Sequence, residues 1–120
     1  MRILFVDDLK DARELFRIAF SMQGHAVQLA SNGLEAVAAV QSNEPFDVIV
    51  MDVEMPQMNG WDAVRTIRTL PQGRDLPIVM FTAYGNGVTQ KLAQEVGANG
   101  VLHKPLSPHE LLAQVAQLAA

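Results

Sequence analysis

Residues 3–8 read Ile-Leu-Phe-Val-Asp-Asp, a continuous apolar run of strand length that ends at two aspartates. The same arrangement returns at residues 48–52, Val-Ile-Val-Met-Asp, and at residues 78–82, Ile-Val-Met-Phe-Thr. These runs are apolar throughout instead of alternating, which is typical of parallel strands that helices cover on both faces. Two less apolar segments predict further strands: residues 26–30, near an edge of the sheet, and residues 101–103, a short fifth strand.

Segments of helical period separate these runs along the chain. One predicted helix follows Asp8, a second is expected to be capped by Ser31, and a third follows Asn59-Gly60. A weaker fourth helix is expected over residues 88–96, and the fifth begins at a capping box formed by residues 107–110 (Ser-Pro-His-Glu). Five strand–helix repeats predict an α/β fold, a doubly wound parallel sheet with helices on both faces. The stripe expected on the first helix is Ala12, Leu15, Phe16, Ala19 and Met22, and the second helix carries Leu34, Val37, Ala38 and Gln41.

The composition of this 120-residue chain limits the classes of function. Cysteine is absent, which excludes a disulfide scaffold and a cysteine-based metal site. With 13 acidic against 9 basic residues, the chain is not expected to bind nucleic acid directly. No apolar run reaches the roughly 18–20 residues that span a bilayer, so we expect no membrane insertion and a cytoplasmic location. We expect one domain, residues 1–120, whose last helix reaches Ala120 and whose output is contact with another protein.

Polar side chains follow four of the five predicted strands, at Asp7-Asp8, Asp52, Thr82 and Lys104. Because the carboxyl ends of parallel strands share one edge of the sheet, these side chains are expected to converge where open α/β folds bind ligands. Each has an ordinary explanation by itself: an aspartate can cap a helix, a threonine can end a strand, and a lysine can be solvated. Their coincidence at four strand ends predicts a functional site.

The charges of these residues predict a bound cation. Three aspartates and one lysine leave a net charge of −2 at the site. Two like charges about 4 Å apart cost on the order of 4 kcal/mol at an effective dielectric constant near 20, so the site must take up a proton or a cation. Carboxylate oxygens without neighbouring histidine or cysteine favour Mg²⁺ over zinc or a redox metal.

Carboxylates, a lysine and a hydroxyl beside Mg²⁺ are the groups that phosphoryl transfer requires. Asp52 is single and follows a central strand, so it is the expected nucleophile, whereas the adjacent Asp7 and Asp8 suit a pair that holds the metal. Phosphorylation of Asp52 would add roughly one negative charge, which Lys104 and Thr82 could bind.

Taken together, these residues resemble a known family. The whole chain is similar to a receiver domain of two-component response regulators, in particular to the stand-alone chemotaxis regulator. The matching segments, in the family's order and approximate spacing, are Val6-Asp7-Asp8, Met51-Asp52, Met55-Pro56, Asn59-Gly60, Thr82-Ala83, Gly97-Ala98 and Lys104-Pro105.

The resemblance implies a flavodoxin-like sheet in the order 2-1-3-4-5 with five helices. It implies a regulatory domain rather than an enzyme, with Asp52 as the phosphoacceptor for a histidine kinase or a phosphotransfer protein. Thr82 would be the switch hydroxyl and Lys104 the ion pair of the phosphate, with a cis bond between Lys104 and Pro105. The metal ligands would be Asp8 and Asp52 directly, Asp7 mainly through water, and the backbone carbonyl of Glu54.

One position departs from the family pattern. The family usually places an aromatic residue three positions before the conserved lysine, and here Val101 takes that place. We therefore expect the output to work through the loop after Thr82 and the helix that follows it. The helices before and after Lys104, with the strand between them, form the expected partner surface. Glu54 and Tyr84 occupy positions that tune the lifetime of the phosphate in the family.

Three other interpretations stay open at the level of sequence. A metal-dependent aspartyl phosphatase would share the carboxylates, although the segment 52–54 (Asp-Val-Glu) lacks the second aspartate that such enzymes use as a general acid. A flavodoxin-type flavin-binding domain would share the topology, but Asp7-Asp8 would repel a phosphate. A receiver-like module that binds partners without being phosphorylated is the third, and Val101 is compatible with it.

Overall fold

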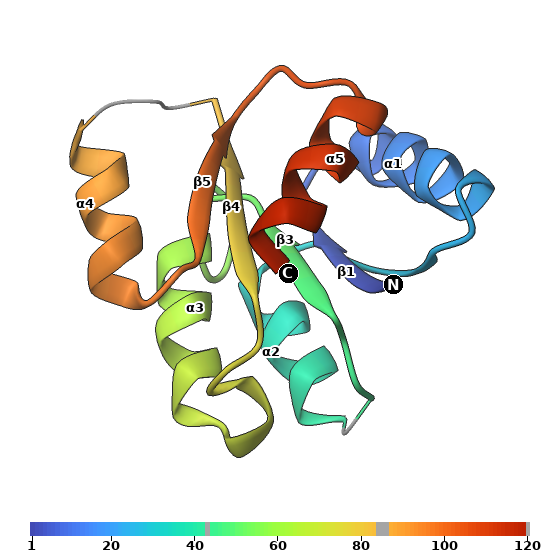
Figure 1. Ribbon diagram of the computed structural model, residues 1–120. Helices are drawn as coiled ribbons and strands as arrows, with labels where there is room; N and C mark the ends of the chain where they lie inside the picture. Colours follow the sequence, from blue (N-terminus) through green and yellow to red (C-terminus); the bar gives the residue numbers. More distant parts are fainter. Residues whose placement is uncertain (43, 84–86, 120) are drawn as a thin grey trace.

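The computed structural model describes residues 1–42, 44–83 and 87–119. Within these residues, strands and helices alternate from one end to the other (Figure 1). The elements are β1 (Arg2–Val6), α1 (Lys10–Met22), β2 (Ala26–Ala30), α2 (Gly33–Gln41), β3 (Val48–Met51), α3 (Gly60–Thr69), the 3₁₀-helix η1 (Pro71–Gly73), β4 (Ile78–Thr82), α4 (Gly87–Val96), β5 (Gly100–His103) and α5 (Pro108–Ala119).

The sheet has the predicted topology. Its five strands lie in the order β2-β1-β3-β4-β5, and every neighbouring pair is parallel. Helices α1 and α5 cover one face of the sheet, and α2, α3 and α4 cover the other (Figure 1). The less apolar segment Ala26–Ala30 forms the edge strand β2, as its composition predicted.

Alternate residues of each strand supply two separate cores. Ile3 and Phe5 point to the face covered by α1 and α5, whereas Leu4 and Val6 point to the face covered by α2, α3 and α4. All four of these side chains are almost completely buried. The core beneath α1 and α5 is aromatic: the ring of Phe5 stacks on that of Phe16, with 4.8 Å between their centroids. The strands are therefore apolar throughout because both of their faces are covered.

The predicted inward face of α1 was partly wrong. Leu15 and Met22, which we expected on the buried stripe, are 56% and 83% exposed, while Phe16 and Phe20 are buried. The two phenylalanines are one turn apart and pack edge to face at 5.7 Å, so this pair sets the rotation of the helix. The inward face of α2 was also partly wrong, because Leu34, Ala38 and Gln41 are exposed. The buried residues of α2 are Gly33, Ala36, Val37, Ala39 and Val40.

The helix starts show one correction and one confirmation. Asn32, not Ser31, caps α2, because its side-chain oxygen accepts a hydrogen bond from the Glu35 amide at 2.9 Å. Ser31 instead donates its hydroxyl to the Glu35 carboxylate. The capping box of α5 is present as predicted: the Ser107 hydroxyl accepts from the Glu110 amide, and the Glu110 carboxylate accepts from the Ser107 amide.

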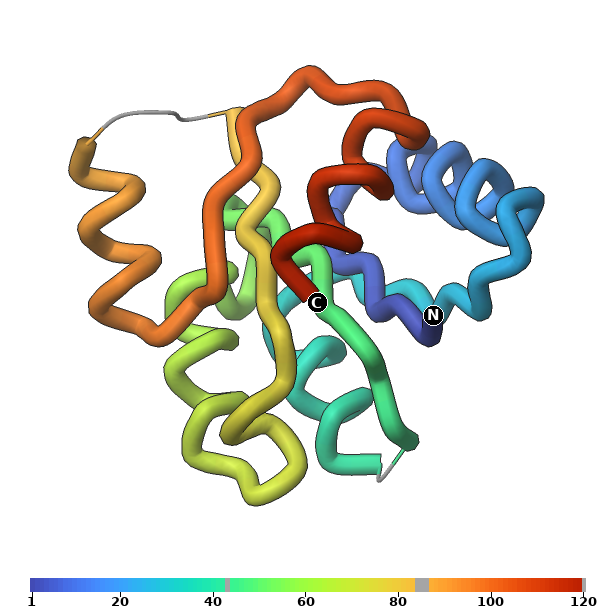
Figure 2. Tube along the Cα trace, in the orientation of Figure 1, coloured from blue at the N-terminus to red at the C-terminus, as the bar shows by residue number. Residues whose placement is uncertain are grey.

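The path of the chain determines which loops surround the predicted site. Figure 2 shows the segment after β5 passing over the carboxyl edge of the sheet before it enters α5. The loops that follow β1 and β3 leave the sheet at this same edge. Among the described residues, no helix is both long enough and apolar enough to cross a membrane.

Candidate functional site

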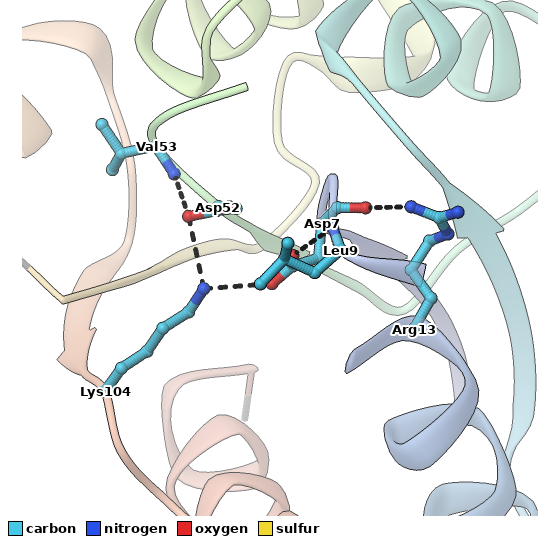
Figure 3. Close-up of polar contacts among 6 residues, drawn as sticks. All are labelled: Asp7, Leu9, Arg13, Asp52, Val53 and Lys104. Carbon is cyan, nitrogen blue, oxygen red and sulfur yellow. Dashed lines mark hydrogen bonds and ion pairs between the residues drawn. The ribbon is translucent and has the colours of Figure 1, made fainter. Parts of the chain in front are cut away.

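The carboxyl edge of the sheet brings together the acidic residues and the lysine that the sequence predicted. Asp7 follows β1, Asp52 follows β3, and Lys104 follows β5. The Lys104 ammonium lies 3.0 Å from Asp7 Oδ2 and 3.4 Å from Asp52 Oδ1, between the two carboxylates (Figure 3). It also lies over the Phe81 ring, 5.3 Å from the ring centroid, and the face of an aromatic ring attracts a cation.

Asp8 completes an acidic cluster at this edge. One carboxylate oxygen from each of Asp7, Asp8 and Asp52 lies within 4.8 Å of the others. Asp7 and Asp52 are buried, at 1% and 8% exposure, whereas Asp8 is exposed to solvent. Hard oxygen donors that combine buried carboxylates with one open side match the preference of Mg²⁺, which retains several waters when it binds proteins. The donor set therefore fits the predicted metal.

Asp7 is fixed by the turn between β1 and α1. Its Oδ1 accepts a hydrogen bond from the Leu9 amide at 2.9 Å, which leaves Oδ2 for Lys104. The Arg13 guanidinium, one turn into α1, donates to the Asp7 backbone carbonyl at 2.8 Å. Asp7 does not cap α1, because the cap position is Leu9, which has no side-chain cap. Two independent contacts thus orient the backbone and the carboxylate of Asp7.

The surroundings of Asp52 disfavour the ionised form of its carboxyl group. Its Oδ1 accepts a hydrogen bond from the Val53 amide at 2.8 Å. Burial, together with the nearby charge of Asp7, raises the pKa of Asp52 to about 6, although Lys104 opposes this shift. Burial lowers the pKa of Lys104, but the bonds and charges of Asp7 and Asp52 outweigh it and raise that pKa overall. Asp52 is therefore ionised at neutral pH, and a nearby cation would stabilise this ionised form.

Thr82 and the segment after β5 border the same site. Thr82 ends β4 and is 1% exposed, and its backbone carbonyl accepts a hydrogen bond from the Lys104 amide at 2.8 Å. The bond between Lys104 and Pro105 is cis, as the resemblance implied. Val101 pairs with Met80 in the sheet and is partly buried against the core beneath α2, α3 and α4.

The remaining predicted positions lie in the loops around the site. Glu54 is exposed in the loop between β3 and α3, which also contains Asp52. Tyr84 lies outside the described residues. Gly60, at the start of α3, has no room for a side chain, because a Cβ there would lie 2.1 Å from the Asp52 carbonyl oxygen. Its amide donates to the Val53 carbonyl at 2.8 Å and closes the base of this loop.

Sequence reasoning missed several residues that shape this site. Arg13 was not singled out, although it stands six positions after Asp7 on the predicted first helix. The contacts of Asn32 and Gly33 with the loop after Asp52 were also missed. The dipeptide Asn32-Gly33 carries the same signal as Asn59-Gly60, namely a capping side chain followed by a residue without Cβ.

Comparison with known proteins identifies the family of this chain. Residues 3–116 match the sequence profile of the response regulator receiver domain. The chain belongs to that family. Receiver domains are regulatory signalling domains of two-component systems, so the expected recognition and fold are both confirmed. The flavin-binding domains and aspartyl phosphatases that share its topology or its carboxylates are thereby set aside.

Individual relatives and structures agree with this assignment. The chain is 38% identical over 117 residues to the uncharacterized 14.6 kDa protein in the sodA1 3' region of Leptolyngbya boryana, covering 98% of this chain and 88% of that protein. It is 39% identical over 118 residues to the response regulator MprA of Mycobacterium avium (strain 104), covering 98% of this receiver but only half of MprA.

Two solved structures show the same architecture. The Vibrio cholerae chemotaxis protein CheY4 superimposes with a TM-score of 0.92 at 34% identity, over 98% of this chain and 97% of CheY4. The receiver domain of the sensor histidine kinase PA1611 of Pseudomonas aeruginosa superimposes with a TM-score of 0.88 at 28% identity, over 98% and 96% of the two chains. The PA1611 structure has a magnesium ion coordinated in its active-site cleft.

Proposed function

We propose that this receiver is a signalling switch that accepts a phosphoryl group on Asp52. The donor is the phosphohistidine of a histidine kinase or a phosphotransfer protein, and the acceptor changes its affinity for a protein partner when it is phosphorylated. The observation that carries the proposal is the buried Asp52 carboxylate, which faces the Lys104 ammonium at 3.4 Å beside two further aspartates. A receiver fold and a magnesium ion in the related PA1611 domain support it.

The acidic cluster is proposed to hold Mg²⁺. Asp8 and Asp52 would bind it directly, Asp7 mainly through water, and the Glu54 backbone carbonyl would supply a further oxygen. When bound, Mg²⁺ would neutralise negative charge on the oxygens of the transferring group. The exposed side of Asp8 leaves this position open to solvent and to the phosphodonor.

The side chains of this receiver would carry out the transfer as follows. An Asp52 carboxylate oxygen attacks phosphorus and forms an O–P bond, while the P–N bond to the donor imidazole breaks and its electron pair returns to nitrogen. The Val53 amide and Lys104 both contact Oδ1, so we expect Oδ2 to be the attacking oxygen. Because the pKa of Asp52 is about 6, this carboxylate is ionised at neutral pH.

Phosphorylation would redistribute the contacts of Lys104. An acyl phosphate carries about two negative charges, so the ammonium is expected to move from Asp7 towards the phosphoryl oxygens. The buried Thr82 at the end of β4 is the proposed hydroxyl donor to the same group. Shifting a two-state equilibrium from 1:99 to 99:1 requires about 5.5 kcal/mol of differential stabilisation, which these new charged hydrogen bonds would supply.

The proposed output runs through α4, β5 and α5. Thr82 ends the strand that precedes α4, and Lys104 lies between β5 and α5. Both proposed phosphate ligands are therefore adjacent in the chain to the surface formed by α4, β5 and α5. Val101 on β5 cannot make the ring rotation of an aromatic residue. The response is therefore proposed to pass through the segment after Thr82 and through α4 rather than through a rotating ring at position 101.

Phosphoryl uptake tests this function. The purified protein is incubated with phosphoramidate and Mg²⁺, and its intact mass is measured. We expect a gain of one phosphoryl group that is stable in acid and labile in base. The variant Asp52→Asn should show no gain, and Asp8→Asn should need much more Mg²⁺. The absence of any gain in the wild type, or an equal gain in Asp52→Asn, would rule out the proposed phosphoacceptor.

A further inference from the structure

The loop between β3 and α3 carries both Asp52 and Glu54, and its tip is strained. The Met58 amide donates to the Pro56 carbonyl at 2.7 Å, and the residue between them, Gln57, has a φ of +68°. A hydrogen bond across three residues with positive φ at the centre is the geometry of the strained γ-turn. Gln57 is the one residue other than glycine with positive φ in the described part of the chain. Such a conformation persists only when its surroundings hold it.

The start of α2 provides these surroundings. The Gly33 amide donates to the Met58 carbonyl at 3.0 Å. The Asn32 side chain donates from Nδ2 to Gln57 Oε1 at 3.3 Å, while its Oδ1 caps α2 through the Glu35 amide. Asn32 is itself buried, at 7% exposure. One asparagine thus joins the cap of a helix to the strained tip of a loop 25 residues away.

Close approach of the two backbones requires a glycine at position 33. A Cβ on Gly33 would lie 2.6 Å from the Met58 carbonyl oxygen and 2.8 Å from its side chain. The first amides of a helix have no partner within the helix, so the Gly33 amide is available to hold a carbonyl of another segment. Gly33 therefore contributes a backbone amide that has no partner within the helix and the absence of a side chain. Asn32 contributes the side chain that caps α2.

We propose that Asn32 and Gly33 are positioning residues for metal binding. They clamp the strained tip of the loop at Gln57 and Met58, and the bond between the Gly60 amide and the Val53 carbonyl fixes its base. Glu54 lies between these two attachments, so the clamp determines where its backbone carbonyl lies relative to Asp52. This inference rests on the proposed function, because it assumes that the acidic cluster binds Mg²⁺.

Groups that orient metal ligands without touching the metal commonly contribute about 10–100-fold to metal affinity. Replacement of Gly33 by alanine must move Met58, and with it the loop, because the clash is with a backbone carbonyl. We therefore expect Gly33→Ala to weaken Mg²⁺ binding about tenfold. Asn32→Ser retains a capping oxygen but is too short to reach Gln57, and it should weaken binding less.

Isothermal titration calorimetry with Mg²⁺ alone tests the clamp, with Gly73→Ala as the matched control. A Cβ on Gly73 would also clash with a backbone carbonyl, 2.3 Å from that of Ile67, but η1 lies at the opposite end of the fold from the site (Figure 1). Both alanine variants should unfold at lower urea concentrations. Only Gly33→Ala should lose Mg²⁺ affinity, because only its clash reaches the loop that carries Glu54.

A second variant separates positioning from stability. Gln57→Gly relieves the positive φ, which offsets the loss of the hydrogen bond from the buried Asn32, so the free energy of unfolding should change little. It also removes the partner of Asn32 and frees the tip, so Mg²⁺ affinity should fall. This pairing of retained stability with weaker metal binding would not follow from a purely structural role.

The outcomes separate this inference from the proposed function. Absence of Mg²⁺ binding by the wild type would contradict the proposed function itself. Binding by the wild type, together with wild-type affinity in Gln57→Gly and in any folded Gly33→Ala, would overturn the clamp and leave the proposed function standing. Equal losses of affinity in Gly33→Ala and Gly73→Ala would also overturn it, since the effect would then be general destabilisation.

Discussion

Two half-buried cations, Lys104 and Arg68, hold opposite edges of the same sheet in different ways. Lys104 lies at the carboxyl edge, where one ammonium is shared between the carboxylates of Asp7 and Asp52 at 3.0 and 3.4 Å. Its partners are charged, they outnumber it, and its contact with Asp52 is long. A lysine in this setting can exchange one anionic partner for another, because its compact ammonium has three donors on a flexible stem.

Arg68 lies at the amino edge, where α3 ends and β4 and β5 begin. Its Nε and Nη2 donate to the Gly97 carbonyl at 3.0 and 2.8 Å, and its Nη1 donates to the carbonyls of Gly73 and Leu76, each at 2.7 Å. Nη2 also donates to the Asn99 side chain at 3.0 Å. The planar guanidinium thus ties three segments through neutral acceptors in fixed directions.

The difference separates a structural contact from a functional one. Arg68 satisfies backbone carbonyls that no ligand would displace, so its hydrogen bonds are expected to be the same in every state of the protein. Lys104 neutralises only part of the negative charge around it, so its contacts should respond to a metal ion or to a phosphoryl group. Stability measurements with and without Mg²⁺ can distinguish the two.

Removal of Arg68 should have the largest effect on stability. Arg68→Met leaves the partly buried carbonyls of Gly73 and Leu76, and the exposed carbonyl of Gly97, without this donor. A lost partner costs about 1 kcal/mol or more for each partly buried group and less for an exposed one. We expect the free energy of unfolding in urea to fall by about 3 kcal/mol, by the same amount with and without Mg²⁺. A loss that Mg²⁺ reverses would contradict the structural role.

Removal of Lys104 should cost less, and Mg²⁺ should reverse the loss. Lys104→Met leaves Asp7 and Asp52 close together without a counter-charge. Breaking a fully buried ion pair costs several kcal/mol, but Lys104 is partly exposed and Asp52 can take up a proton, so we expect about 2 kcal/mol at pH 7.5. Added Mg²⁺ should restore most of this free energy, as measured by urea unfolding at increasing Mg²⁺ concentration. An equal loss at all Mg²⁺ concentrations would mean that Lys104 acts like Arg68.

The pH dependence of Asp52→Asn gives the smallest expected effect. The raised pKa of Asp52 means that the folded state holds its proton more tightly than the unfolded state does. The stability contributed by this proton is full below about pH 4 and is lost as the pH rises through about 6. At pH 7.5 without Mg²⁺, Asp52→Asn should therefore stabilise the fold by about 1 kcal/mol, after allowance for solvent screening.

The gain from Asp52→Asn should shrink as the pH falls through 6 and vanish near about pH 3, where the wild-type aspartate is protonated in both the folded and the unfolded state. Urea unfolding between pH 3 and pH 8 measures it directly. Arg68→Met serves as the comparison, because the hydrogen bonds of Arg68 go to neutral acceptors that do not titrate. A gain that is independent of pH would show that burial does not raise the pKa of Asp52 in the folded protein.

The sheet and the residues at its carboxyl edge could be predicted because they follow from short stretches of sequence. Runs such as Val48–Met51 are apolar at every position, which indicates a strand covered on both faces, and parallel strands must end at one edge. Asp7 and Asp52 each follow such a run directly, and Lys104 follows the shorter, less apolar segment 101–103, so their convergence follows from the parallel topology. The capping box at residues 107–110 is equally local.

The remaining features depend on contacts between distant segments. The stripe expected on α1 placed Met22 inward, whereas the packing of Phe20 against Phe5 of β1 accompanies a buried Phe20 and an exposed Met22. Arg68 acquires its role from Gly97, 29 residues away, and Asn32 from Gln57, 25 residues away. No local sequence pattern predicts these contacts, because an arginine on a helix and an Asn-Gly pair at the start of a helix are both common. The positive φ of Gln57 occurs where Asn32 and Gly33, from a distant segment, contact the loop.

Asp52 is the proposed phosphoacceptor, and chemical trapping of the acyl phosphate locates the phosphoryl group on the chain. After reaction with phosphoramidate and Mg²⁺, the acyl phosphate is reduced with borohydride to an alcohol, and the protein is digested and sequenced by mass spectrometry. We expect residue 52 alone to be converted from aspartate to homoserine. Conversion at Asp7 or Asp8, or a phosphoryl group found on a histidine, would contradict it.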